Sequence, residues 1–220
     1  MKRLLIILLL VFCVTNLFAD SVEEKVLEST NSMKKLIRNR NGIPIQIIQK
    51  AQAIVIIPSS VKVGIFIGMK YGEGVASIRK ADGSWSYPFF IKISGGSLGF
   101  QLGVESADSI FVFRTQNSVN ELLKNKFTIG VGASASAGPI GANIEKNSEI
   151  NMQAEIFTYS QTKGLFAGAS FEGAVLSNDE NKNKALYGGD ISVNKIVTSE
   201  NLSDVYSVQE FLKNIENLTR

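Results

Sequence analysis

Apolar residues recur at helical spacing near both ends of the sequence and at alternate positions through much of the middle. Between Ser21 and Arg40, this spacing comes with acidic residues early and basic residues late, which predicts an amphipathic helix that stops at Gly42. The same spacing predicts a last helix near the end of the chain. Its apolar residues are Val205, Val208, Phe211, Leu212 and Ile215.

Two shorter helices are predicted between these ends. One starts at Pro44, a favoured first position, and runs toward Ala51. The other begins where Ser118 and Glu121 have capping-box spacing before two leucines.

The middle of the chain reads as β-strands. The run "AIVII" ends at Pro58, and "VGIFIGMKYGEGVASIRKADGSWSYPFFIKISGG" contains three strand-like runs with a hairpin turn at Ala81 to Ser84. Further strands are expected at residues 97–105, 109–115, 127–136, 151–159 and 164–176. About seven or eight short strands favour a curved antiparallel sheet or an incomplete barrel. With the helices at both ends, the predicted class is α+β.

The stretch "LFAGASFEGAV", residues 165–175, is rich in glycine and nearly free of charge. It is too short to span a membrane and contains Glu172, so a strand is the better interpretation. Leu165, Phe171 and Val175 would then share one face. Gly168 and Gly173 are expected on this strand, where a neighbouring backbone comes close.

Residues 1–19 have the pattern of a secretory signal peptide. Lys2 and Arg3 precede an apolar run, and Ala19 is the expected cleavage site. The bulky Leu17 is unusual two positions before that site, so an uncleaved anchor is the alternative. Residues 20–220 are expected to form a single domain in the periplasm or outside the cell.

The charge balance offers little attraction for nucleic acid. Removal of Lys2 and Arg3 from the 23 basic residues leaves one more basic than acidic residue, since the acidic residues number 20. The only cysteine, Cys13, lies in the predicted signal peptide, so the mature chain is expected to have no disulfide and no thiolate chemistry.

Most catalytic and metal-binding arrangements are excluded by composition. The chain has no histidine, which removes the usual catalytic triads and nearly every zinc site. The glycine-rich runs lack the residues of a phosphate-binding loop or a dinucleotide fingerprint. We therefore expect no enzyme, no catalytic residue, no metal and no cofactor. The remaining catalytic hypothesis would use carboxylates, and we interpret these as surface groups. They are Glu73, Glu105, Glu155 and Glu172.

Several segments together resemble one family, the SYLF domain. They are "IPIQIIQKAQAIVIIP", "KVGIFIGMKYGEGV", "GSWSYPFFIKISGGSLGFQLGVESAD", "FTIGVGASASAGPIG" and "YSQTKGLFAGASFEGAVL" with "YGG" downstream, between Ile43 and Gly188. The resemblance implies a lipid-binding module, also described as a Ysc84-like actin-binding domain in some fungal proteins, without enzyme activity. A secretory signal would place this chain away from actin, so lipid is the partner we expect.

The predicted lipid site combines basic residues with an aromatic side chain. On the first helix, basic residues would attract anionic phospholipid while the apolar stripe enters the headgroup boundary. The alternative is that this helix only packs on the sheet. A second group lies on the strands, where core packing competes for the aromatic run from Trp85 to Phe90. The candidates are Lys34, Lys35, Arg38, Arg40, Lys62, Lys70 and Trp85.

The sequence thus leaves two functional hypotheses. The leading one is a lipid-binding module at an envelope membrane. The other is a protein-interaction module that presents a sheet face or strand edge to another envelope protein.

Overall fold

The computed structural model describes residues 21–39, 42–65, 67–98, 103–140, 153–162, 165–169 and 171–220. The helices in this part of the chain are α2 (Val22–Ile37), α3 (Ile45–Gln49), α4 (Gln116–Leu122), α6 (Glu180–Tyr187), α7 (Val193–Thr198) and α8 (Tyr206–Thr219). The strands are β1 (Ala53–Ile65), β2 (Ile67–Ile78), β3 (Phe89–Leu98), β4 (Gly103–Phe113), β5 (Lys126–Thr128), β6 (Ala135–Ala137), β7 (Ile156–Thr162), β8 (Leu165–Gly168) and β9 (Val175–Asn178).

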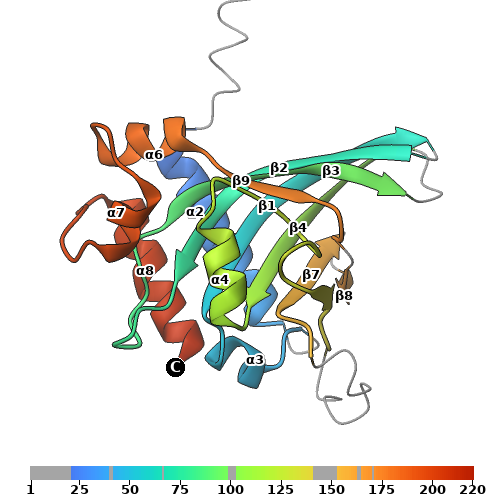
Figure 1. Ribbon diagram of the computed structural model, residues 1–220, viewed down its shortest axis with the longest axis horizontal. Coiled ribbons are helices and arrows are strands. Elements are labelled where there is room, and N and C mark those ends of the chain that lie inside the picture. Colours follow the sequence, from blue (N-terminus) through green and yellow to red (C-terminus); the bar gives the residue numbers. More distant parts are fainter. Residues whose placement is uncertain are drawn as a thin grey trace, which may run out of the picture.

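All of these strands belong to one curled sheet. Their order is β5-β9-β3-β2-β1-β4-β7-β6, and β8 pairs with β7. The pairs are antiparallel except for β6 with β7. Helices from both ends of the chain gather at one end of the sheet, while β1, β2 and β3 project from the other (Figure 1). The predicted α+β class and curved antiparallel sheet are confirmed.

A bulge bends β1 where the sequence suggested that the strand ends. Ile57 pairs with Ser109 but Ser60 pairs with Ala107, so β1 contains one extra residue, next to Pro58. Ser59 at this bulge has a φ of 48°. Proline is tolerated at a bulge because no ladder hydrogen bond is required there, and a bulge increases the local bend. The strand therefore continues to Ile65.

The helical predictions held, with one difference in capping. Ser21 caps α2 by accepting a hydrogen bond from the backbone N–H of Glu24 at 3.1 Å. The cap of α4 is Thr115, three residues before the predicted Ser118, and these two residues form the capping box. The short helices α6 and α7 were not predicted.

The strand boundaries differ most in the glycine-rich parts. The segment predicted at residues 97–105 spans the end of β3 and the start of β4, and residues 127–136 divide into β5 and β6. The predicted turn at 81–84 is present, with the backbone N–H of Lys80 donating to the carbonyl oxygen of Ser84 at 2.7 Å.

The single long strand predicted at 164–176 is wrong. The chain turns between β8 and β9, with Gly173 in the turn at a φ of 81° and no atom near the position of a Cβ. Leu165 is 79% exposed whereas Phe171 is buried, so they do not share a face. Gly168 does lie on a strand, β8, where it pairs with Tyr159.

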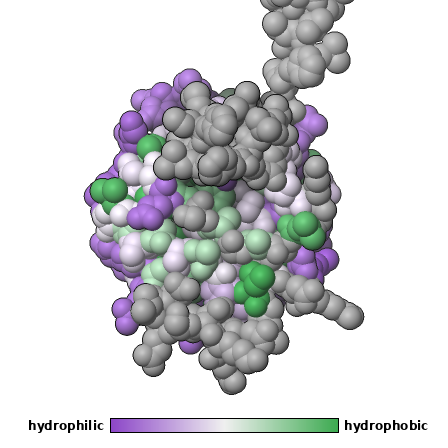
Figure 2. Space-filling model, turned by 90° about the vertical axis from the view of Figure 1, so that its right-hand side faces the viewer, coloured by the Kyte–Doolittle hydropathy of each residue, from purple (hydrophilic) through white to green (hydrophobic). Residues whose placement is uncertain are grey.

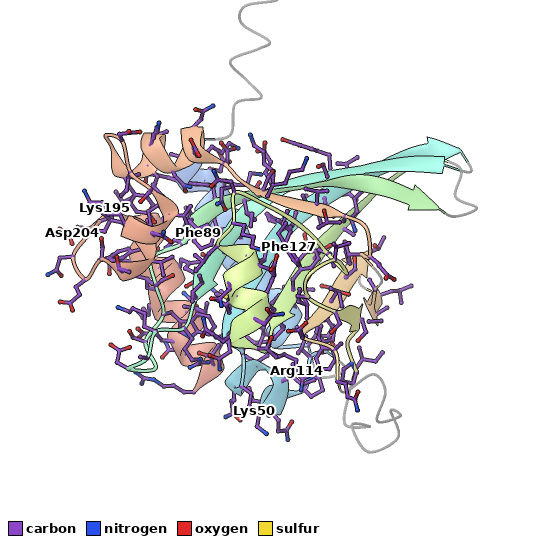
Figure 3. The ribbon with its side chains drawn as sticks, viewed as in Figure 1. Lys50, Phe89, Arg114, Phe127, Lys195 and Asp204 are labelled. Carbon is purple, nitrogen blue, oxygen red and sulfur yellow. The ribbon has the colours of Figure 1, made fainter. Side chains whose placement is uncertain are left out.

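The sheet separates two hydrophobic cores. The face toward α2, here called the α2 face, is packed against α2, α3 and α8; its buried strand residues include Ile54, Ile56, Val75, Phe90 and Ile110. The opposite face, the α4 face, is covered by α4, α7 and the segments around β5 and β9; its buried residues include Val55, Ile57, Phe89, Phe111 and Phe127. Figure 3 shows Phe89 and Phe127 inside the molecule, with the exposed Lys50, Lys195 and Asp204 near its margins.

Candidate functional site

The apolar stripe of α2 is part of the core and does not face solvent. Val26, Met33 and Leu36 are fully buried against the sheet and α8. The prediction that this stripe enters a lipid headgroup layer is therefore wrong, and the alternative of a helix packed on the sheet is correct.

The basic residues of α2 remain at the surface, but two of them have acidic partners. Lys35 Nζ lies 2.9 Å from Asp108 Oδ2 on β4, and Lys34 Nζ lies 3.8 Å from Glu210 Oε1 on α8. Arg38, which follows the helix, is exposed. Arg40 lies outside the described residues. Much of the positive charge of this cluster is thus balanced locally.

Core packing, one of the two possibilities for the aromatic run from Trp85 to Phe90, is the one observed. Trp85 is 4% exposed, and Tyr87, Phe89 and Phe90 are also buried. The indole N–H of Trp85 donates to Thr219 Oγ1 at 2.9 Å, and the Arg79 guanidinium stacks 4.5 Å from the Trp85 ring. Trp85 therefore anchors the end of α8 and offers no surface to a lipid, which corrects its assignment to the site.

Lys62 and Lys70 lie opposite each other near the projecting end of the sheet. Lys62 on β1 pairs with Lys70 on β2 and with Glu105 on β4, and Lys70 pairs with Gly95 on β3. Lys70 Nζ lies 3.2 Å from the ring centroid of Phe171, a cation–π contact on the α4 face. Beyond this row, the sequence contains no charged residue at positions 63–69 or 96–104.

A row of charged residues crosses the α2 face at the edge of its helical cover. Lys92 on β3 lies beside Glu73 on β2, and Asp108 occupies the same level on β4. Each has a partner from the covering helices or their caps. Lys92 Nζ lies 2.9 Å from Asp179 Oδ2, Lys182 of α6 forms an ion pair with Glu73, and Asp108 is bound by Lys35. We call Lys92, Glu73 and Asp108 the boundary row.

The first row of the α2 face beyond the boundary row is exposed. The next cross-strand row is Ser94, Tyr71, Val61 and Ser106, one residue from each of β3, β2, β1 and β4, and all four are exposed. Tyr71 is 50% exposed and Val61 38%. We call the described parts of these strands from this row outward the sheet end (residues 61–65, 67–71, 94–98 and 103–106). Figure 2 views the molecule from the side toward which β1, β2 and β3 project; among its coloured residues, pale and light green ones lie near the middle and the strongest green ones toward the margins.

The carboxylates considered as catalytic candidates either accept structural hydrogen bonds or lie apart from one another. Glu73 accepts hydrogen bonds from Tyr71 and Lys182. Burial alone would raise the pKa of Glu73, but these hydrogen bonds outweigh it and hold the pKa below its usual value.

Glu155 holds a loop in place. Its carboxylate accepts from Asn117 Nδ2 at 2.8 Å, Thr115 Oγ1 at 2.9 Å and the backbone N–H of Ser134 at 2.9 Å. The hydrogen bond from Asn117 is the main reason that the pKa of Glu155 is lowered. Glu105 is placed on β4, and Glu172 is exposed in the turn before β9.

Within the described residues there is neither a metal-binding cluster nor a membrane-spanning helix. No group of three or more acidic, histidine or cysteine side chains there could hold a metal ion. None of the described helices combines the length and the apolar character needed to cross a bilayer.

Comparison with known proteins identifies relatives. The family described as "Ysc84: Las17-binding protein actin regulator" matches residues 94–218. The chain is 32% identical to human SH3 domain-containing YSC84-like protein 1 over 192 residues, which is 82% of this chain and 56% of the relative. The bovine protein of the same name is 36% identical over 160 residues, 70% of this chain and 47% of the relative.

A fungal relative is similar over almost the same length. LAS seventeen-binding protein 3 of Saccharomyces cerevisiae is 31% identical over 177 residues, 79% of this chain and 38% of the relative. The chain spans about half the length of the bovine and human relatives that it matches.

Proposed function

Because the chain belongs to the Ysc84 (SYLF) family, we propose that it is a non-enzymatic module that binds anionic phospholipid membranes. The observation that carries this proposal is the sheet end. An exposed row on the α2 face is covered by neither a helix nor a loop among the described residues. The chain segments that follow this row contain no charged residue. Exposed apolar surface that the fold itself leaves uncovered is typical of a contact with a membrane or another protein.

Positive charge near the sheet end supports an anionic partner. Lys62 on β1 is the register partner of Lys70 on β2 and of Glu105 on β4. Arg38 adds an exposed charge after α2. A basic residue close to an anionic leaflet contributes about 1 kcal/mol of attraction. The ion pairs of Lys34 and Lys35 reduce their share, so apolar contact has to provide much of the affinity.

The proposed place of action is a membrane of the bacterial envelope. The basic residues and apolar run at the start of the sequence support export to the periplasm or the exterior. Mass spectrometry of the protein from its own host tests this: a mass that starts at Asp20 indicates a free protein, and a full-length mass indicates an anchored one.

Co-sedimentation with vesicles tests lipid binding. The protein is mixed with vesicles of phosphatidylcholine alone or with added phosphatidylglycerol, at low and high salt. We expect sedimentation to increase with phosphatidylglycerol and to weaken with salt, because salt screens the attraction. Absence of sedimentation at every composition would reject the proposal.

Paired lysine variants identify the charges involved. Lys62→Gln with Lys70→Gln is expected to weaken binding to anionic vesicles by roughly 30-fold, from about 1 kcal/mol for each charge. The matched control is Lys126→Gln with Lys195→Gln, two exposed lysines elsewhere, which should bind as the parent does. A third variant, with Gln at Lys34, Lys35, Arg38 and Arg40, measures the contribution of the α2 cluster.

A protein partner is the second candidate, favoured by the outer edges of the sheet end. Among the described residues, no strand pairs with the outer edge of β3 from Gly95 to Leu98 or of β4 from Gly103 to Ala107. Such edges can accept an added strand from another chain. The family description names Las17 binding and actin regulation, and the yeast relative is named as a LAS seventeen-binding protein. A protein that ignores all vesicles but is retained by an envelope protein would support this candidate.

A further inference from the structure

We infer that a small polar cavity beside α6 binds a neutral molecule rich in hydroxyl groups, of the size of one sugar ring. The cavity has a volume of about 180 Å³ and is lined by α6, by the segment that leads into α7 and by Asn125, just before β5. In Figure 1, α6 and α7 lie on the opposite side of the molecule from the projecting ends of β1, β2 and β3. This site is therefore separate from the sheet end and does not depend on membrane binding.

The wall of this cavity contains a buried amide whose hydrogen-bonding capacity is only partly used. Asn183 on α6 is 1% exposed. Its Oδ1 accepts a hydrogen bond from the backbone N–H of Phe90 on β3 at 2.7 Å, while its Nδ2 has no partner among the described residues. Because Oδ1 is turned toward β3, the N–H groups of Nδ2 are what Asn183 offers to a bound molecule. Buried amide groups in native proteins almost always have a partner, and an oxygen atom in the cavity would supply it.

A second amide with the same deficit lies next to the cavity. Both Nδ2 and Oδ1 of Asn178, the last residue of β9, are buried without a hydrogen-bond partner in the described part of the chain. The backbone N–H of Asn178 donates at 3.1 Å to the carbonyl oxygen of Asn125, which belongs to the cavity wall. Unsatisfied polar atoms of two residues thus gather at one place in the fold.

The charges around the cavity favour a neutral ligand over a phosphate. Lys184 is the basic residue of the wall, and its Nζ lies 2.7 Å from Asp190 Oδ1, also in the wall. Glu180, exposed at the start of α6, adds a second carboxylate. Two carboxylates and one ammonium group leave an excess of one negative charge, which would repel an anion.

The remaining features of the wall match a sugar or another cyclic polyol. The carboxylates accept hydrogen bonds whereas Asn183 Nδ2 donates them, and a hydroxyl group can do both. Ile191 and Val193 give the wall an apolar part, which the C–H groups of a ring can contact. A few polar groups among apolar ones are the usual composition of a small-molecule site. The volume equals the space of about six water molecules, which suits one ring and is too small for an oligosaccharide.

NMR spectroscopy of side-chain amides tests whether the cavity binds a sugar. Spectra that correlate ¹H and ¹⁵N are recorded while glucose, N-acetylglucosamine, myo-inositol or sodium phosphate is added in the millimolar range. The Nδ2 signals of Asn183 are assigned by their loss in Asn183→Asp. We expect them to shift in a saturable manner with at least one of the three polyols and not with phosphate. No saturable shift with any polyol overturns the inference, and so does a shift with phosphate alone.

A vesicle experiment separates a free sugar from the sugar headgroup of a lipid. Phosphatidylcholine vesicles with and without a monoglucosyl diacylglycerol are sedimented with the protein, in the presence and absence of glucose. Sedimentation that requires the glycolipid and is reversed by glucose assigns the site to a headgroup. Saturable shifts with glucose but no sedimentation assign it to a free sugar.

Variants of the wall tie the binding to this cavity. Asn183→Asp keeps an oxygen for Phe90 but removes the donor, so affinity for the polyol should fall roughly tenfold, as for one lost hydrogen bond. Val193→Phe adds bulk at the wall and should abolish the shifts, and it serves as the test if Asn183→Asp does not fold. The matched control is Asn181→Asp, at an exposed position of α6, which should bind as the parent does. A folded Val193→Phe protein that binds the polyol as tightly as the parent overturns the assignment to this cavity.

Discussion

Two cross-strand rows on the α2 face belong to the same four strands but have opposite surroundings. The inner row is Phe90, Val75, Ile56 and Ile110, and each of these side chains is almost fully buried under α2 and α8. The outer row is Ser94, Tyr71, Val61 and Ser106, and each is exposed. The polar residues between them, Lys92, Glu73 and Asp108, hold α2 and the start of α6 in place through ion pairs.

The difference teaches that an apolar strand pattern has two uses in this protein. At the inner row, apolar side chains on both faces of the sheet build the two cores. At the outer row, the apolar side chains of Val61 and Tyr71 are exposed on the α2 face. Burial within the chain explains the first pattern. The second suits a contact with something outside the chain.

Truncation on either side of the boundary row should separate stability from binding. Ile56→Ala at the inner row is expected to lower the free energy of unfolding by about 2–5 kcal/mol, because it leaves a cavity in a closely packed core. Val61→Ala, on the same strand and face, should lower it by less than about 0.5 kcal/mol. Denaturant titration measures both. Equal losses would show that the sheet end is as tightly packed as the base.

A glycine of the inner region gives a second contrast. A Cβ on Gly74 would lie 1.9 Å from the carbonyl oxygen of Ile56, so β1 and β2 must move apart to accept it. Gly74→Ala should therefore reduce the free energy of unfolding by about 1–3 kcal/mol. Ser94→Ala, at an exposed position on β3, serves as the control, and a Gly74→Ala protein as stable as the parent would contradict the close approach.

Substitution of Glu73 in the boundary row should give the smallest effect on stability, and this effect should appear only at acidic pH. The pKa of Glu73 is lowered in the folded state, so its contribution is present above the ordinary glutamate pKa and is lost as pH falls through the folded-state value. Between neutral and acidic pH, the parent should lose more unfolding free energy than Glu73→Gln. The difference should be less than about 1 kcal/mol, since the group is partly exposed. Thermal unfolding between neutral and acidic pH measures it, with the exposed Glu172→Gln as control. An identical pH dependence in Glu73→Gln and the parent would show that the Glu73 carboxylate does not stabilise the boundary row.

Much of the fold follows from local patterns in the sequence. Helical spacing and the order of acidic and basic residues predicted α2, and alternation predicted the central strands, because both depend on neighbouring residues. The helix α6 was missed because its sequence "ENKNKALY" has few apolar residues, and its position depends on Lys182 and Asp179 meeting β2 and β3. The glycine-rich turn at Gly173 was missed because alternation continues across it.

The candidate site was predicted less well because cover by distant helices decides exposure. Trp85 and the following aromatic residues could have faced either solvent or core, and contacts with α8, far along the chain, bury Trp85. Lys62 and Lys70 were identified as basic residues on strands, but their direct pairing depends on the β1–β2 register. The boundary row combines residues from three strands and two helical regions, which no local pattern brings together.

The most direct test of the central claim is vesicle binding by a variant with charges in the exposed row of the sheet end. Val61→Asp with Tyr71→Asp places two carboxylates there, on β1 and β2. The matched control is Ile45→Asp with Tyr206→Asp, which charges two exposed apolar positions on α3 and α8. Co-sedimentation with phosphatidylcholine and phosphatidylglycerol vesicles is measured together with the thermal unfolding of each protein. We predict that the sheet-end variant keeps its fold and loses roughly tenfold or more in binding, while the control binds as the parent does. A folded sheet-end variant that binds as strongly as the parent would contradict the claim.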